Sequence, residues 1–200
     1  MKAKRDLVVI GGGPGGLVIA SVAAQLGLKV TLAEKSDRLG GDCLHHGCVP
    51  SKTLIRSARV AHLMRNGARY GLPACDPEID LNPIIDRVEA VISDIQQHDD
   101  PERFRAYGCD VRFAPARFTA PHEVQIDDEI VTAKRIVIAN GSQPADPHIP
   151  CQQDEGYDTN ETRYRFRHLQ PRLAVIGEGQ DGVELAHALA RLCSQVTLND

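Results

Sequence analysis

The 200-residue sequence is 42% hydrophobic and 25% charged, with a formal net charge of −4. This composition is typical of a globular chain in water, and the length allows one good-sized domain and part of another. The sequence has no excess of basic residues and no tryptophan, which argues against nucleic-acid binding.

The N-terminus has some features of a secretory signal, because Lys2, Lys4 and Arg5 precede an uncharged run over residues 7–28. However, the stretch Gly11–Gly16 holds five glycines and a proline, which makes a poor apolar helix. A similar glycine pattern recurs near the end of the chain, where no signal peptide can lie. We therefore expect a cytoplasmic protein with no membrane segment in this chain.

The chain opens with the pattern of a β-α-β unit. Residues 7–10 form a short β-branched run, which predicts a buried parallel strand. A glycine-rich turn follows, then a helix of small residues up to Gly27, and then a second strand over residues 29–33 that ends in Glu34. This order is typical of a dinucleotide-binding unit.

The glycines of the turn match the Gly-x-Gly-x-x-Gly spacing. Gly11 permits a tight turn, Gly13 lets the backbone approach a pyrophosphate, and Gly16 allows the helix to pack close to the strand. The helix N-terminus offers free N–H groups to the phosphates. Glu34 can accept hydrogen bonds from a ribose hydroxyl. The sequence thus predicts a dinucleotide site at this turn.

A second motif occupies residues 40–52, where Cys43 and Cys48 lie five residues apart. They can form a disulfide if the backbone between them brings their Cα atoms within about 4.4–6.8 Å, and Gly47 supplies the freedom for that turn. Lys52 adds a positive charge nearby, which favours thiolate over thiol. The stretch therefore predicts a reactive dithiol.

Two other interpretations of this motif fit the sequence less well. A purely structural disulfide is typical of secreted chains, and this chain shows no secretory context. A metal site would need His45 and His46 to converge with both sulfurs inside one short loop, and tetrahedral geometry does not allow this readily; we expect no metal site. The remaining cysteines are scattered as core or surface thiols of a reducing compartment: Cys75, Cys109, Cys151 and Cys193.

The middle of the chain alternates helical and strand patterns. A helix is predicted over residues 51–65, a loop over 66–80, and a second helical stretch over 81–107 that Pro101 interrupts. Short strands are predicted at 110–114 and 117–119, a hairpin at 123–126 and 129–132, and a buried strand at 135–139. This last strand ends at Asn140-Gly141-Ser142.

The opening unit returns near the end of the chain with a constant offset of 166 residues. Residues 173–176 repeat the first strand, and an acid, Asp200, stands where Glu34 stood. The glycines of the first turn are repeated as Gly177, Gly179 and Gly182. We therefore divide the chain into a first dinucleotide-binding domain (1–145), a proline-rich and polar linker (146–170) and the start of a second such domain (171–200).

The dithiol segment resembles the redox-active disulfide of the pyridine nucleotide-disulfide oxidoreductases, the flavoprotein family of lipoamide dehydrogenase, mercuric reductase and glutathione reductase. It matches the pattern Gly-Gly-x-Cys-aliphatic-x-x-Gly-Cys-aliphatic-Pro at every fixed position, and Pro50-Ser51-Lys52 suits the first two branches. The resemblance spans essentially the whole chain. It implies an α/β fold: a Rossmann-like FAD/NAD(P)-binding domain with a parallel sheet and an inserted antiparallel β element, plus the first β-α-β of a second Rossmann unit.

The resemblance also implies roles for individual residues. FAD would lie on the first unit and a nicotinamide dinucleotide on the second. Cys48 would face the flavin and Cys43 would exchange with the substrate, while Lys52 would lie near the flavin ring and pair with Glu184. Gly41, Asp42 and Gly141 would contact the FAD, and the second glycine set with Asp200 would bind the nicotinamide dinucleotide, NAD(H) in preference to NADP(H).

Some residues depart from the family pattern. Asp42 replaces a threonine, Asn140 another threonine, and His45 an asparagine. His46 stands where an aliphatic residue is common, and Asp181 adds an acid to the second glycine loop. Two imidazoles beside the cysteines can tune thiolate formation or can be neutral packing groups.

The resemblance implies an FAD-dependent enzyme that passes electrons from NAD(P)H through FAD and the Cys43–Cys48 disulfide to a disulfide or metal-ion acceptor, as a homodimer when full length. The family's C-terminal half has no counterpart here, so we expect a fragment that binds FAD without NADH-linked turnover. The alternative is a flavin-binding module that senses redox state without turnover.

Overall fold

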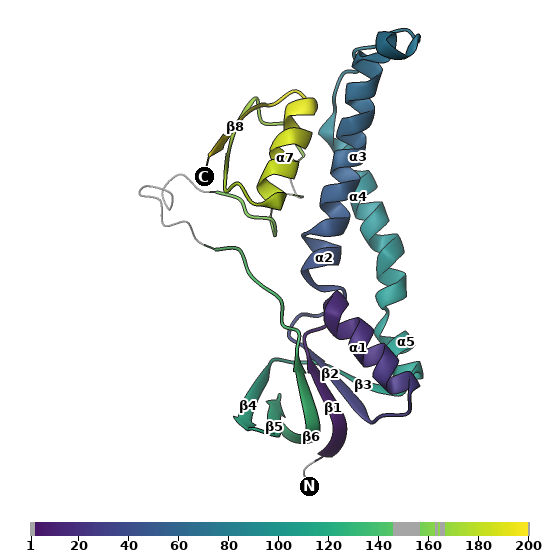
Figure 1. Ribbon diagram of the computed structural model, residues 1–200, viewed down its shortest axis with the longest axis vertical. Helices are drawn as coiled ribbons and strands as arrows, with labels where there is room; N and C mark the ends of the chain where they lie inside the picture. Colours follow the sequence, from purple (N-terminus) through teal and green to yellow (C-terminus); the bar gives the residue numbers. More distant parts are fainter. Residues whose placement is uncertain (1–2, 146–156, 163, 165–166, 200) are drawn as a thin grey trace. The chain divides into compact units, whose positions relative to one another are not determined.

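The computed structural model describes residues 3–145, 157–162, 164 and 167–199. The chain forms two compact units, Met1–His45 with Asp94–Pro147 and His46–Ser93 with His148–Asp200 (Figure 1). The predicted linker over residues 146–170 falls in part outside the described residues. No helix in the described part of the chain is long and apolar enough to cross a membrane.

A six-stranded sheet is the centre of the first unit, in the order β3-β2-β1-β6-β5-β4. The first four strands of that order run parallel to one another, and this is the 3-2-1 arrangement of a dinucleotide-binding fold. The predicted α/β class is confirmed. The parallel strands are β1 (Ala3–Ile10), β2 (Val30–Glu34), β3 (Cys109–Phe113) and β6 (Glu129–Ile138).

The antiparallel element is formed by β4 (Ala116–Ala120), β5 (Glu123–Ile126) and the first residues of β6. The predicted hairpin at residues 123–132 is confirmed. The separation of residues 129–132 from 135–139 is wrong, because β6 is one strand. Residues 129–132 of β6 pair with β5 and residues 131–138 pair with β1, and no glycine or proline interrupts the strand.

Helices α1 (Pro14–Gln25) and α5 (Pro101–Ala106) cover one face of the parallel sheet; Figure 1 shows α1 in purple along strands β1 to β3. The core between them contains Leu17, Val9, Leu32 and Phe104, each at most 5% exposed. The opposite face packs Val8 and Ala33 against the antiparallel strands. Alternate residues of each strand thus enter different cores.

The second unit is built on two neighbouring helices. The apolar stripe of α3 meets that of α7 through side chains that are almost fully buried: Leu54, Ala58, Ala61, Leu185, Ala188 and Leu192. The elements are α3 (Cys48–Arg65), α4 (Leu81–Gln96), whose last residues belong to the first unit, β7 (Arg172–Ile176), α7 (Gln180–Arg191) and β8 (Gln195–Asn199). Strands β7 and β8 are parallel.

The structure shifts two predicted helix bounds. Helix α3 begins at Cys48 and not at Ser51, because Pro50 is compatible with a first helical turn, where its missing N–H is not needed. The predicted break at Pro101 is confirmed: α4 ends at Gln96, the short helix η2 (Gln97–Asp99) follows, and Asp100 caps α5 by accepting a hydrogen bond from the backbone of Glu102.

Candidate dinucleotide and redox site

The first glycine turn has the tight geometry that the sequence predicted. Gly11 has φ = +108°, and its N–H donates to the carbonyl of Ala33 at 2.8 Å. A Cβ on Gly11 would lie 2.2 Å from the carbonyl oxygen of Ala139. Only glycine fits a position that combines a positive φ with this approach of a neighbouring strand.

The next glycines set how α1 leaves the turn. A Cβ on Gly16 would lie 1.9 Å from the carbonyl oxygen of Gly11, so the helix begins in direct backbone contact with the loop. Gly13 is the N-cap residue of α1 and, being glycine, offers no side-chain hydrogen bond to the first N–H groups of the helix. The N–H groups of this first turn therefore point to an anion-binding position at the positive end of the helix dipole.

Glu34 occupies the end of β2 and is 7% exposed. Its Oε2 accepts a hydrogen bond from the N–H of Gly12 at 2.6 Å, and its Oε1 accepts one from the N–H of Ser36 at 2.8 Å. A carboxylate has further lone pairs on both oxygens. The backbone thus fixes Glu34 beside the glycine turn with acceptor capacity left for a ribose hydroxyl.

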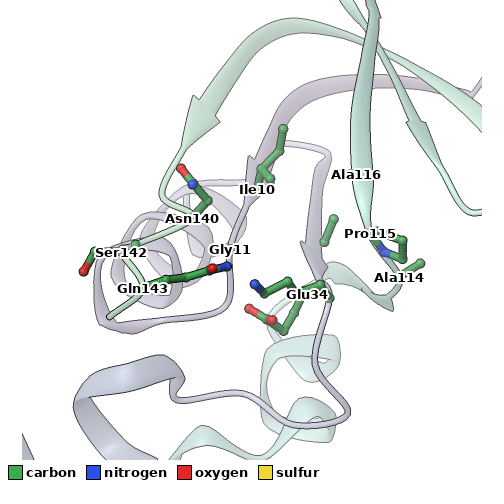
Figure 2. Close-up of a pocket in the computed structure, with 12 residues that line it drawn as sticks. Ile10, Gly11, Glu34, Ala114, Pro115, Ala116, Asn140, Ser142 and Gln143 are labelled. Carbon is green, nitrogen blue, oxygen red and sulfur yellow. The ribbon is translucent and has the colours of Figure 1, made fainter. Parts of the chain in front are cut away.

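A pocket of about 430 Å³ opens where the parallel strands end. Figure 2 shows Glu34 inside it, beside Gly11 and opposite the connection between β3 and β4. Ligands of open α/β sheets bind at this carboxyl edge. The lining residues are Ile10, Gly11, Ala33, Glu34, Lys35, Ala114, Pro115, Ala116 and Asn140 to Gln143.

Part of this wall was not predicted from the sequence. The residues Ala114, Pro115 and Ala116 carry no motif, and only the pairing of β3 beside β2 brings them to the pocket. Gly141, which the sequence did single out, lies in the wall with φ = +71° and open space around its Cα. Glycine and exposed backbone here allow a ligand to approach the chain closely.

The dithiol segment is joined to the glycine turn by backbone contacts. The N–H of Gly40 donates to the carbonyl of Gly12 at 2.9 Å, and a Cβ on Gly41 would lie 2.6 Å from the Cα of Gly13. The short helix α2 (Gly41–His45) follows directly and carries Asp42 and Cys43. The predicted phosphate loop and the first cysteine therefore belong to one packed structure.

The two cysteines of the motif differ from Cys109 in their surroundings. Cys43 is half-buried on α2, while Cys48 is an exposed free thiol at the first residue of α3. Burial in the core raises the pKa of the Cys109 thiol to about 11, so Cys109 remains protonated and inert near neutral pH. Among the described residues, no group of three or more His, Cys, Asp and Glu is placed to hold a metal ion.

In the second unit, the structure brings Lys52 and Glu184 together. The Nζ of Lys52 lies 2.5 Å from Oε2 of Glu184, and Gln180 donates to the other carboxylate oxygen at 3.4 Å. Lys52 extends from the first turns of α3 and Glu184 from those of α7. The pairing implied by the resemblance is present, while its relation to a flavin stays a prediction.

The second glycine turn has nearly the same geometry as the first. Gly177 has φ = +107° and donates to the carbonyl of Asn199 at 2.7 Å, and a Cβ on Gly182 would lie 2.0 Å from the carbonyl oxygen of Gly177. Gly179 is the N-cap of α7. Asp181, in the first turn of α7, is exposed; Asp200 lies outside the described residues.

Comparison with known proteins agrees with this geometry. The family model described as "Pyridine nucleotide-disulphide oxidoreductase" matches residues 5–200. The chain belongs to this family. The resemblance that the cysteine motif and the two glycine turns indicated is therefore confirmed.

Curated relatives in the family include two enzyme types. The chain is 32% identical over 193 residues to a mercuric reductase of Lysinibacillus sphaericus, covering 96% of this chain and 35% of that protein. It is 35% identical over 201 residues to a dihydrolipoyl dehydrogenase of Thermus scotoductus, covering 96% of this chain and 41% of that protein. The chain thus spans well under half the length of these relatives.

A solved structure has the same fold. The Cu(II) complex of the HOCl-induced flavoprotein disulfide reductase RclA from Escherichia coli matches with a TM-score of 0.81 and 26% sequence identity. The match covers 96% of this chain and 41% of that chain. The Rossmann-like architecture is therefore shared with a flavoprotein disulfide reductase.

Proposed function

We propose that the full-length protein is an FAD-dependent disulfide oxidoreductase that passes electrons from NAD(P)H through FAD and the Cys43–Cys48 pair to a disulfide or metal-ion acceptor. The main support is the attachment of the Cys43 segment to the first glycine turn, through Gly40 on Gly12 and Gly41 on Gly13. A dinucleotide in that turn would thereby have a redox-active cysteine in the adjoining helix. The family of the chain supports the same assignment.

The residues of the first unit fit FAD. The N–H groups at the start of α1 suit its pyrophosphate, the fixed carboxylate of Glu34 suits a ribose, and the open backbone at Gly141 leaves space beside the pocket. When bound, FAD supplies two-electron transfer between a nicotinamide and a disulfide. The protein's part is to bind and orient it.

The cysteines then carry out the exchange with the acceptor. The thiolate of Cys43 attacks one sulfur of an acceptor disulfide, and the other acceptor sulfur leaves and takes up a proton. The thiolate of Cys48 next attacks the Cys43 sulfur of this mixed disulfide. The second acceptor thiol leaves, and the Cys43–Cys48 disulfide is restored. The exposure of Cys48 and the half-exposure of Cys43 leave both sulfurs accessible for these steps.

Three finer assignments belong to the same proposal. Asp200, at the end of the second β-α-β pattern, favours NAD(H) over NADP(H), because a carboxylate accepts hydrogen bonds from a ribose 2′-OH and repels a 2′-phosphate. The acceptor is of the lipoamide or mercuric-ion type, as in the relatives. The full-length protein acts as a homodimer.

Anaerobic stopped-flow mixing of the FAD-loaded full-length protein with NADH tests this function. We expect the flavin to be reduced and then a long-wavelength charge-transfer band to form between the Cys48 thiolate and the flavin. Cys48→Ser should abolish this band, and Cys75→Ser, which changes an exposed cysteine outside the motif, should retain it. A protein whose flavin is reduced by NADH but is not reoxidised by a disulfide or metal-ion acceptor would be a sensor and not a reductase.

A further inference from the structure

His45 stands two residues after Cys43, on the same short helix. Its side chain is buried, with 8% exposure, and its Nε2 lies 2.9 Å from the carbonyl oxygen of Leu39. A carbonyl oxygen can only accept a hydrogen bond, so Nε2 carries a proton. His45 thus donates a hydrogen bond to the backbone segment just before its own helix.

Helix α2 needs such an anchor because it has only five residues, Gly41–His45. A single helical turn is not stable by its own hydrogen bonds. Two side chains hold it on the turn at Gly40, which has φ = +111°: a Cβ there would lie 2.5 Å from Cδ2 of Leu44 and 3.1 Å from Nε2 of His45. Since Leu44 is apolar, His45 supplies the directional contact.

The carbonyl of Leu39 has a second, weaker donor. The Nε2 of Gln96, the last residue of α4, lies 3.3 Å from it. The carbonyl of Leu39, a fully buried residue, therefore accepts two hydrogen bonds, and the one from His45 is the shorter. If the His45 hydrogen bond is lost, the Gln96 bond partly replaces it. We therefore expect the loss to cost about 1 kcal/mol, which is roughly fivefold in the equilibrium constant between dithiol and disulfide.

We propose that His45 is a positioning residue for the redox pair: its hydrogen bond to the carbonyl of Leu39 fixes α2, and with it Cys43, on the turn over residues 39–41. This inference rests on the proposed redox role of Cys43 and Cys48. His45 itself touches neither acceptor nor flavin in this role.

Two substitutions separate the directional contact from the volume of the side chain. His45→Gln keeps a side-chain N–H donor at a similar reach, and His45→Leu removes the donor while filling a similar volume. The measurement is the equilibrium between dithiol and disulfide of the full-length protein in glutathione buffers, followed by alkylation and peptide mass mapping of Cys43 and Cys48.

We expect His45→Leu to shift the equilibrium constant between dithiol and disulfide about fivefold. His45→Gln should keep the constant near the wild-type value, because its amide N–H can still donate to the carbonyl of Leu39.

His122→Leu is the matched control, since His122 makes a comparable imidazole contact, from Nδ1 to the carbonyl of Ala133 at 3.1 Å, on the antiparallel element. It should leave the thiol equilibrium unchanged. A wild-type constant in His45→Leu, or an equal shift in His45→Leu and His45→Gln, would overturn the positioning role; should His45→Leu not fold, a shifted constant in His45→Gln would overturn it. A wild-type protein that forms no Cys43–Cys48 disulfide would instead overturn the proposed function itself.

Discussion

The Nζ of Lys52 lies 2.5 Å from Oε2 of Glu184, a residue 132 positions later in the chain. The contact joins the beginnings of α3 and α7, and Arg65 joins their ends by donating to the carbonyl of Arg191 at 2.6 Å. The two helices therefore run side by side in the same direction, with the second glycine turn at the start of α7. The side chains of the Lys52–Glu184 pair are 55% and 25% exposed.

We predict that Glu184→Gln has little effect on stability but a clear effect on redox chemistry. A partly exposed ion pair contributes about 0–1 kcal/mol to the free energy of unfolding. If flavin reduction requires the Lys52 ammonium to be held in place, loss of its charge-assisted hydrogen bond costs roughly 1.5–3 kcal/mol. This is on the order of tenfold to a hundredfold in the rate of flavin reduction. Urea unfolding and the rate of flavin reduction by NADH measure the two effects.

Glu78→Gln is the control for this prediction, because Glu78 is an exposed acid of the same unit outside the glycine turns. It should leave the rate of flavin reduction near the wild-type value. An equal slowing by both substitutions would show that the general charge of the unit matters and not the held ammonium. A wild-type rate in Glu184→Gln would remove the role given to the pair.

We predict that alanine is tolerated at Gly15 and not at Gly16. A Cβ at Gly16 would lie 1.9 Å from the carbonyl oxygen of Gly11, whereas a Cβ at Gly15 has no atom within 4 Å. Backbone atoms cannot move apart cheaply, so Gly16→Ala must displace α1 from the turn. Two measurements test this: the FAD affinity of each variant, monitored by fluorescence quenching, and thermal unfolding. Equal FAD affinity in both variants would contradict the prediction.

We predict that Asp110→Asn destabilises the first unit near neutral pH and less so in acid. Asp110 accepts hydrogen bonds from Arg5 at 2.8 Å, Arg112 at 2.9 Å and Thr31 at 3.1 Å. Burial alone would raise its pKa, but these donors together lower the pKa of Asp110 below its usual value. The carboxylate therefore contributes stability above the unfolded-state pKa of about 4, and this contribution is lost as the pH falls through the folded-state pKa.

The expected loss is about 1 kcal/mol at pH 7, since the network is partly solvated. Urea unfolding at several pH values should show the difference between Asp110→Asn and wild type narrowing below about pH 4. Asp37→Asn, at an exposed position, should match wild type throughout. A difference that stays constant with pH would mean that packing, not ionisation, is responsible.

We predict that Asp200→Ala lowers the preference for NADH over NADPH. The lost hydrogen bond to a ribose hydroxyl costs roughly 1.5–3 kcal/mol, on the order of tenfold to a hundredfold in affinity. The measurement is the ratio of kcat/KM for the two nucleotides in the full-length protein. A wild-type preference for NADPH, or a ratio that the substitution does not change, would refute the role of Asp200.

The sequence by itself was sufficient for features whose cause is local. The first strand, its glycine turn and their repeat with an offset of 166 residues follow from short apolar runs and from glycines at fixed spacing. The positive φ at Gly11 and Gly177 and the close contacts of Gly16 and Gly182 are direct consequences of that spacing. The break at Pro101 and the hairpin of β5 with the start of β6 are local in the same sense.

Only the tertiary structure decided the features that depend on distant residues. It shows that residues 129–138 form one strand shared between β5 and β1, and that Ala114 to Ala116 line the pocket. It also shows His45 turned inward onto Leu39. Small apolar residues and a single histidine carry no periodic signal of their own, and their neighbours are chosen by strand pairing and packing between segments far apart in the chain.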